Sequence, residues 1–222
     1  MRIAIIGYGK MGHMIERLAT ERGIEVALKL DEYNNANFAG ISPENFRGID
    51  AAIEFSTPST VVGNIERIAA LGVNLVVGAT GWHDQIDRIK SLVKQHNIGL
   101  VWSPNYSVGV NAFLRIVQTA AKLLPEYEAW AWEIHHSAKK DAPSGTLLKL
   151  VEQMGDRHVD IASNRAGVIP GTHEIGFDSA ADTITLRHTA RSREGFALGA
   201  IKAAEWVAGK KGFYEFGDIL FG

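Results

Sequence analysis

Short apolar runs alternate with amphipathic helical patterns through the first hundred residues. Runs of β-branched and other apolar residues predict strands, and apolar positions spaced three and four apart predict helices between them. The predicted strands cover residues 2–9, 24–31, 49–56, 73–81 and 98–105, and the predicted helices cover residues 10–23, 57–72 and 83–97. This alternation is typical of an α/β fold, and we expect a Rossmann-type, doubly wound parallel sheet.

The pattern changes after residue 105. Residues 108–124 predict a helix, whereas residues 127–135 alternate in polarity, with Glu133 and His135 on one face of the strand and three apolar side chains on the other. Such a strand belongs to an antiparallel or mixed sheet. Further strands are predicted at 173–179 and 182–190, and helices at 147–154 and 196–212.

These changes divide the chain into three segments. We expect a dinucleotide-binding domain at residues 1–104 and an inserted α+β domain at residues 105–193. Residues 194–222 should return to the first domain, where the last helix packs.

Composition excludes several classes of protein. The 222 residues include no cysteine, so a disulfide framework, a thiolate metal site and a thiol nucleophile are absent. The formal charge of -2 does not fit a strongly basic nucleic-acid-binding chain. No apolar run reaches the roughly 18 residues of a membrane span, and the first apolar run is too short for a signal peptide. We expect a cytoplasmic protein that holds no metal and binds neither nucleic acid nor membrane.

Gly7, Gly9 and Gly12 form a G-x-G-x-x-G motif between a predicted strand and a predicted helix. The glycines allow a tight turn, close approach of a pyrophosphate and close packing of helix on strand. Asp31 ends the next strand, where its carboxylate would accept hydrogen bonds from ribose hydroxyls. The alternative is that these glycines serve only a tight turn, but the flanking elements and the acid favour dinucleotide binding.

Two further turns follow predicted strands. "EFSTP" (54–58) and "GATG" (78–81) lie at the carboxyl ends of strands, where open α/β sheets bind ligands. Each alone would be an ordinary turn, but beside the glycine motif both are candidate walls of a nicotinamide pocket. The predicted cofactor-binding residues are Gly7, Gly9, Lys10, Met11, Gly12, Asp31, Phe55, Ser56, Gly78, Thr80, Pro104 and Tyr106.

Acidic side chains decide the expected choice of cofactor. Asp31 and Glu32 together would repel the 2′-phosphate of NADPH, whereas Lys10 would soften that repulsion. We expect NADH to be preferred and NADPH to be used as well. The alternative is that Glu32 points to solvent and both cofactors serve equally.

The loop "HHSAKKDAPSGT" (135–146) concentrates proton-handling and anion-binding groups. Histidine titrates near neutrality and lysine carries a point charge, so His135 and Lys139 suit proton delivery beside an anionic substrate. The Ser-Gly-Thr run at 144–146 precedes a helical pattern, and a helix N-terminus binds carboxylates. The alternatives are that Ser144 only caps the helix and that the lysines only face solvent.

The segment "EIHHSAKKDAPSGT" resembles the signature of the dihydrodipicolinate reductase family, nicotinamide-dependent enzymes of the diaminopimelate route to lysine. The resemblance extends to "GYGKMG", "EFSTP", "VVGATGW", "SPNYSVGVN", "PGTHEIGF" and "SREGFALGA". It implies a Rossmann domain joined to a domain for substrate binding and oligomerisation, assembled as a homotetramer.

By motif position, the resemblance implies roles for the loop residues. His135 would be the general acid, and Lys139 its partner that also binds substrate. His136, Gly145 and Thr146 would hold the two carboxylates of a cyclic imine, and we expect Ser144 to join them. Two departures from the family pattern concern the cofactor side. The segment after Asp31 is shorter than in many relatives, so the flap usually found there is not expected, and Glu32 stands where some relatives carry a basic residue.

Two other functions fit part of this sequence. Another nicotinamide-dependent dehydrogenase, acting on an amino or aldehyde acid, would share the two-domain plan. A redox-sensing NAD(H)-binding module would need only the first domain's chemistry. The histidine loop favours the reductase over both.

Overall fold

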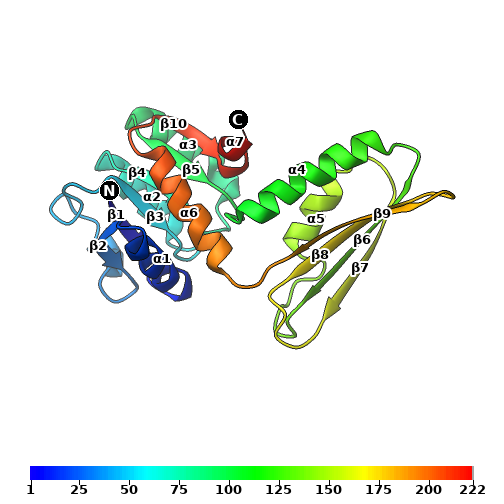
Figure 1. Ribbon diagram of the computed structural model, residues 1–222. Helices are drawn as coiled ribbons and strands as arrows, with labels where there is room; N and C mark the ends of the chain where they lie inside the picture. The colour runs from blue at the N-terminus through cyan, green and yellow to red at the C-terminus, as the bar shows by residue number, and fades with distance from the viewer. Residues whose placement is uncertain (222) are drawn as a thin grey trace. The chain divides into compact units, whose positions relative to one another are not determined.

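A computed structural model describes residues 1–221, which form two compact units (Figure 1). The first unit combines Met1–Ser107 with the chain from Phe196 onward, and the second is Val108–Gly195. No helix in the described part of the chain is long and apolar enough to span a membrane.

The first unit is built on a six-stranded sheet in which every pair of neighbouring strands is parallel. Its strands, in spatial order, are β10 (Gly212–Glu215), β5 (Gly99–Trp102), β4 (Asn74–Val77), β3 (Ala51–Glu54), β1 (Arg2–Ile6) and β2 (Glu25–Leu30). The order reverses at β1, which pairs with both β2 and β3, and ligands of doubly wound sheets bind at such a point. The fold class predicted from the sequence is confirmed.

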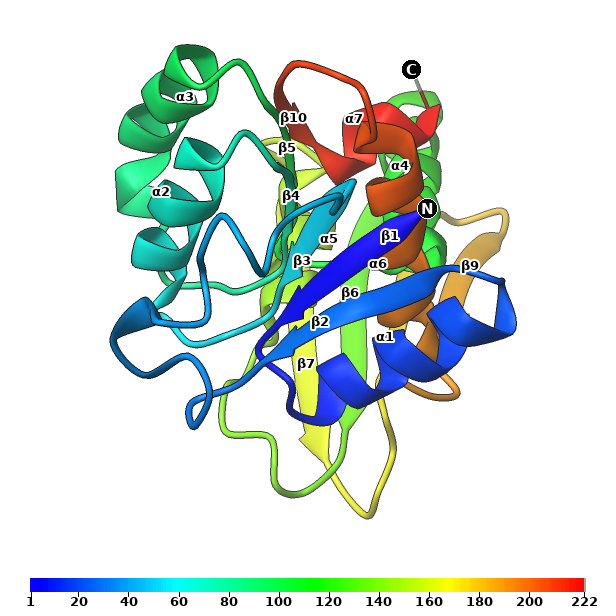
Figure 2. The same cartoon turned by 90° about the vertical axis from the view of Figure 1, so that its left-hand side faces the viewer.

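Helices cover both faces of this sheet (Figure 2). One face is covered by α2 (Val61–Ala70) and α3 (Ile86–Gln95), and the other by α1 (Lys10–Glu21) and α6 (Glu194–Val207). Every position of β3 and β4 is therefore buried, which explains why these strands read as continuous apolar runs rather than alternating ones. The short elements are η1 (Ala36–Phe38), η2 (His83–Gln85) and α7 (Phe216–Phe221).

The second unit is a mixed four-stranded sheet with two helices. Its strands, in spatial order, are β7 (Val159–Arg165), β6 (Glu128–His135), β8 (Thr172–Asp178) and β9 (Thr183–Thr189). β6 pairs with β7 in parallel and with β8 antiparallel, as the alternating pattern of 127–135 predicts for a mixed sheet. The helices α4 (Val108–Leu123) and α5 (Gly145–Glu152) share one apolar core with the sheet.

The buried face of β6 is the one that carries its acid and its histidine. Glu133 and His135 are buried together with two alanines, whereas Trp130 and Trp132 on the opposite face are half-exposed. The small alanines contribute to the core beside α4 and α5. Packing beneath the helices therefore places a carboxylate and an imidazole in the interior.

Four elements have no counterpart in the sequence prediction, among them the three-residue η1. β7 is a largely exposed edge strand with polar residues, and β10 and α7 are only four and six residues long. The helix expected from residue 57 begins at Val61 instead, because the carbonyl of Thr57 accepts the N–H groups of Thr60 and Val61 in a turn that contains Pro58.

Candidate functional site

The glycine motif forms the turn between β1 and α1. The N–H groups of Gly7 and Tyr8 donate to the carbonyl of Leu30 at 2.8 and 3.0 Å. Gly7 has a φ of +91°, and a Cβ there would lie 2.4 Å from the carbonyl oxygen of Phe55. A Cβ at Gly12 would lie 2.7 Å from the Gly7 carbonyl oxygen. Both positions therefore require glycine for packing.

Gly9 and Asp31 give this turn the features of a dinucleotide site. Gly9 is the N-cap of α1 and provides no side-chain cap, and no atom lies within 4 Å of where its Cβ would be. The first N–H groups of α1 are thus open to a phosphate. One carboxylate oxygen of the half-buried Asp31 accepts the N–H groups of Tyr33 and Asn34, which orients the acid at the end of β2. These residues fit a bound dinucleotide.

The remaining predicted cofactor residues differ in their exposure to solvent. Phe55 lies against Gly78, where a Cβ would come within 2.2 Å of the ring. Tyr106 is buried, and its hydroxyl lies 3.0 Å from the carbonyl oxygen of Val77, so its side chain supports the strands from within the core. Lys10, Thr80 and Pro104 are exposed, and Met11 and Ser56 are half-buried.

Glu54, at the carboxyl end of β3, is a buried acid that sequence reasoning did not assign. Its Oε1 accepts hydrogen bonds from the backbone and hydroxyl of Ser56 and from the amide of Asn64. Its Oε2 has no hydrogen-bond partner within the described residues. Burial raises the pKa of Glu54 to about 7, against the opposing effect of Ser56 and Asn64. The motif "EFSTP" thus contributes a carboxyl that titrates near neutrality.

The histidine loop begins where β6 ends. His135 is the last residue of the strand and is buried, whereas His136 lies outside the strand and is half-exposed. Ser144 caps α5, because its side chain accepts the N–H of Leu147 at 3.2 Å. Ser144 therefore does cap the helix, and whether it also binds substrate stays a prediction. Nothing lies within 4 Å of a Cβ at Gly145, so the first turn of α5 is open there.

Glu133 lies at the centre of this unit's polar site and is fully buried. Its Oε1 accepts from the N–H of Ser144 (2.9 Å), the hydroxyl of Ser163 (3.1 Å) and Nη2 of Arg165 (2.9 Å). Its Oε2 accepts the Ser144 hydroxyl. Burial alone would raise the pKa of Glu133, but the hydrogen bonds from Ser144, Arg165 and Ser163 outweigh it, so the pKa is lowered and the carboxylate is ionised.

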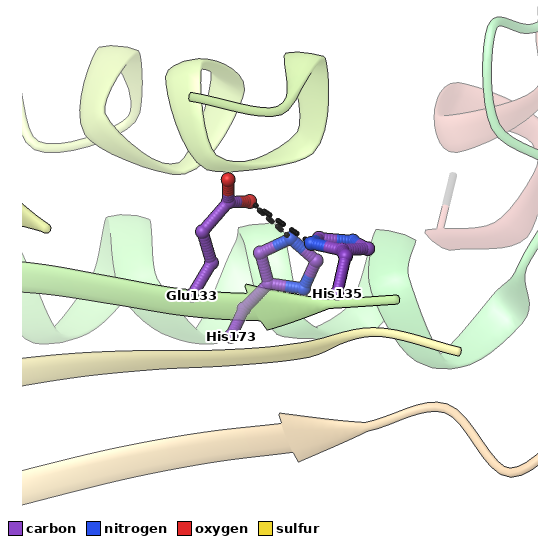
Figure 3. Close-up of side chains that lie close together, drawn as sticks. All are labelled: Glu133, His135 and His173. Atoms are coloured by element: carbon purple, nitrogen blue, oxygen red, sulfur yellow. Dashed lines mark ion pairs between the residues drawn. The ribbon is translucent and has the colours of Figure 1, made fainter. Parts of the chain in front are cut away.

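Two imidazoles face the same carboxylate oxygen (Figure 3). Nδ1 of His135 lies 3.5 Å from Oε2 of Glu133, and Nε2 of His173 lies 3.4 Å from it. The two rings are edge to face, with centroids 5.1 Å apart. Burial lowers the pKa of His173 to about 4, aided by the nearby His135. Burial also lowers the pKa of His135, while the charge of Glu133 opposes that shift.

Lys139 is held by an acid within its own loop. Its Nζ lies 2.7 and 2.9 Å from the two carboxylate oxygens of Asp141, and this pairing lowers the pKa of Asp141. Lys139 and Arg165 both lower the pKa of His135 through their charge. The loop therefore gathers a cation and the predicted proton donor, although the lysine is paired with Asp141.

The spacing of Glu133, His135 and His173 also resembles that of metal ligands, because one atom from each lies within 4.8 Å of the others. However, the Glu133 carboxylate already accepts four hydrogen bonds, one of them from a guanidinium. A cation would compete with Arg165 for it. The expectation that the protein needs no metal stays a prediction.

Sequence reasoning missed Arg165 and His173 in this site, and it gave Glu133 no role. The alternation of β6 put Glu133 and His135 on one face, which was the available signal. His173 lies in the "PGTHEIGF" segment and is directly opposite Glu133 in the register of β6 and β8. That register cannot be obtained from one sequence without the strand pairing.

Comparison with known proteins assigns both units to one family. The family model described as "Dihydrodipicolinate reductase, N-terminus" matches residues 1–106, and the family model described as "Dihydrodipicolinate reductase, C-terminus" matches residues 109–220. The chain belongs to the dihydrodipicolinate reductase family. The family resemblance seen in the sequence is therefore confirmed.

Several relatives match over almost their whole length. Proteins named 4-hydroxy-tetrahydrodipicolinate reductase from Christiangramia forsetii and Thermosipho africanus are 34% and 36% identical to this chain. In both cases the match covers 99% of this chain and 98% of the relative. A relative of the same name from Archaeoglobus fulgidus is 34% identical and is covered completely, with 99% of this chain.

Solved structures show the same fold. A dipicolinate-bound dihydrodipicolinate reductase from Paenisporosarcina sp. TG-14 has a TM-score of 0.84 at 22% identity, with 99% of each chain covered. A DAP dehydrogenase from C. glutamicum has a TM-score of 0.62 at 12% identity, covering 97% of this chain and 92% of that one. The dehydrogenase likeness concerns the fold alone.

Proposed function

We propose that this protein is an NAD(P)H-dependent 4-hydroxy-tetrahydrodipicolinate reductase of the diaminopimelate route to lysine. The observation that carries the proposal is the buried His135 beside the 139–146 loop, in a chain that matches the reductase family along both units. Relatives of that name at 34–36% identity support the same reaction.

The cofactor lies on the first unit, at the turn between β1 and α1. The open N-terminus of α1 at Gly9 binds the pyrophosphate, and Asp31 accepts from the adenosine ribose. When bound, the nicotinamide supplies a hydride to the substrate. NADH is the preferred form, because Asp31 and Glu32 disfavour a 2′-phosphate, and Lys10 allows some use of NADPH.

The second unit binds the dicarboxylate substrate and handles the proton. His136 and the first turn of α5, at Gly145 and Thr146, hold the two carboxylates of the cyclic imine. The Ser144 hydroxyl donates to Glu133, so Ser144 contributes by holding this turn in place. His135 donates the proton that must follow reduction of the ring. Lys139 exchanges its ion pair with Asp141 for one with a substrate carboxylate.

A redox-sensing module would leave this second site unexplained. A sensor that only reports NADH needs neither a buried imidazole nor the carboxylate that faces it. A dehydrogenase for another amino or aldehyde acid shares the fold, but its recognition would not require this family's histidine loop.

Self-association as a homotetramer belongs to the same proposal. Helices α4 and α5 share a core with one face of the second unit's sheet, while the other face presents the half-exposed Trp130 and Trp132. The guanidinium of Arg187 lies 5.9 Å from the Trp132 ring centroid, within reach of a cation–π contact. Sedimentation velocity should give about four times the 24.2 kDa chain mass. A monomer at micromolar concentration would contradict the assembly.

A turnover assay tests the proposed reaction. Pyruvate and aspartate semialdehyde are condensed enzymatically, and the purified protein is then added with NADH. Absorbance at the NADH band should fall only when both condensation substrates are present. Binding of NADH without its consumption would favour the sensor, and consumption with a different keto or aldehyde acid would favour another dehydrogenase.

A further inference from the structure

The contacts of Glu133 divide between its two oxygens. Oε1 accepts from the backbone of Ser144, from Ser163 and from Arg165, and these bonds fix the carboxylate in place. Oε2 accepts the Ser144 hydroxyl and also faces His135 and His173. A fully buried, ionised carboxylate therefore offers its second oxygen to two imidazoles.

The Nδ1 edge of His135 has no other partner. This atom is buried and makes no hydrogen bond within residues 1–221, and Oε2 of Glu133 lies 3.5 Å away. A carboxylate can only accept a hydrogen bond, so it favours a proton on the nitrogen that faces it. Such contacts are often long in the absence of ligands and tighten when substrate is bound.

The opposite edge of His135 is open because of a glycine. Gly171 has a φ of +151°, and a Cβ there would lie 2.8 Å from Nε2 of His135. Any side chain at residue 171 would therefore cover this nitrogen. Nδ1 faces the protein's own acid, and Nε2 faces the space that Gly171 leaves.

We propose that Glu133 is a positioning residue that selects the Nδ1–H form of His135 and stabilises its imidazolium, so that Nε2 gives up the catalytic proton. This inference rests on the proposed function, in which His135 is the proton donor. The Nε2–H bond breaks as the proton passes to the reduced ring, and the imidazolium becomes a neutral imidazole that keeps its proton on Nδ1. Water then returns one proton to Nε2.

The charged and titratable groups around His135 are consistent with this role. Burial has the largest effect and lowers the pKa of His135; Glu133 is the strongest opposing group, Asp141 also favours the protonated ring, and Lys139 and Arg165 disfavour it. His173 on β8 has a pKa of about 4, so near neutrality it is uncharged and does not compete for the proton. Glu133 is thus the buried anion that offsets the cost of charging His135.

The first test replaces Glu133 by Gln in the full chain. We expect kcat to fall about 10- to 100-fold, as for other residues that orient a functional histidine. The alkaline limb of the kcat profile, where His135 loses its proton, should move to lower pH, and NADH affinity should not change. If kcat fell by the same factor at every pH and the pH profile did not shift, Glu133 would have only a structural role. That result would overturn the inference.

A matched control removes a carboxylate from the opposite face of the same sheet. Glu174 follows His173 on β8 and pairs with Arg187 at 3.3 Å, away from the histidine cluster. Glu174→Gln should leave kcat and its pH profile unchanged. An equal shift in both variants would show that general charge, rather than the Glu133 contact, sets the behaviour of His135.

A second measurement does not depend on whether the Glu133 variant folds. Imidazole ¹⁵N shifts of His135 in the native protein, above its pKa, report which nitrogen carries the proton. We expect the proton on Nδ1, and a proton on Nε2 would overturn the inference. A native protein that consumes NADH with the condensed substrate yet shows the Nε2–H form would refute this role of Glu133 while leaving the proposed reaction standing.

Discussion

Ser144 donates both its backbone N–H and its side-chain hydroxyl to the buried carboxylate of Glu133. The two bonds attach the first turn of α5 to β6, eleven residues earlier in the chain. The same hydroxyl also accepts the N–H of Leu147 as the helix cap. One serine therefore links the predicted anion-binding turn to the strand that carries His135.

Ser144→Ala removes a hydrogen bond to a buried charge and a helix cap together. Such losses cost about 1.5–3 kcal/mol and about 1 kcal/mol. We expect thermal melting to show a lower Tm by roughly 5–10 °C in a chain of this size. Ser163→Ala is the matched control, since Ser163 donates to Glu133 but caps no helix. An equal or larger loss in the control would contradict the double role of Ser144.

Thr146→Val tests the anion-binding turn. If Thr146 donates to a substrate carboxylate, loss of a hydrogen bond to a charged group should raise KM roughly 10-fold or more. The affinity for NADH, measured by fluorescence titration, should be unchanged. A parallel loss of NADH affinity would assign this turn to the cofactor instead of the substrate.

Glu54 should make stability depend on pH. Its pKa in the folded protein is about 7, above the ordinary 4.5, so folding favours the protonated form. This pKa shift contributes about 3 kcal/mol at most to the free energy of unfolding. The contribution is fully present below pH 4.5 and is lost as the pH rises through 7. Glu54→Gln mimics the protonated group and should unfold at higher urea than wild type at pH 8.5.

The advantage of Glu54→Gln should shrink as the pH approaches 5. Glu44→Gln, which removes an exposed carboxylate from the same unit, is the control and should follow wild type at both pH values. An advantage of Glu54→Gln that is the same at pH 5 and 8.5 would refute the assigned titration.

Cofactor choice tests the acids after β2. Glu32 is exposed and Asp31 is half-buried, so both lie within reach of solvent at the expected ribose site. Wild type should favour NADH in kcat/KM by a few-fold to about 50-fold, and Glu32→Arg should improve the use of NADPH. A wild type that prefers NADPH, or a variant that gains nothing with it, would contradict the charge argument.

Local patterns carry much of this fold. The parallel sheet, the glycine turn and the helix cap at Ser144 follow from apolar runs, glycine spacing and a capping residue, all of which act within a few positions of the chain. β7 and β10 could not be predicted, because an exposed polar edge strand and a four-residue strand depend on the strands they pair with. The sequence also could not show which face of β6 is buried, since alternation identifies two faces without showing which one packs under the helices.

The candidate site in the second unit also combines residues that local sequence identifies with residues that only strand pairing brings together. His135 and Lys139 could be identified as candidates because their chemistry is concentrated in one loop. Arg165 and His173 reach Glu133 only through the pairing of β6 with β7 and β8, across 32 and 40 residues of sequence. Their role depends on register, which a single sequence does not determine.

The most direct test of this account is a single-turnover comparison of wild type with His135→Gln, using the condensation product of pyruvate and aspartate semialdehyde. Loss of a general acid should slow NADH oxidation by about 10²- to 10⁴-fold. NADH affinity, titrated on the same samples, should stay at the wild-type value, because the dinucleotide turn belongs to the other unit. A variant that oxidises NADH at the wild-type rate would contradict the central claim that His135 supplies the proton.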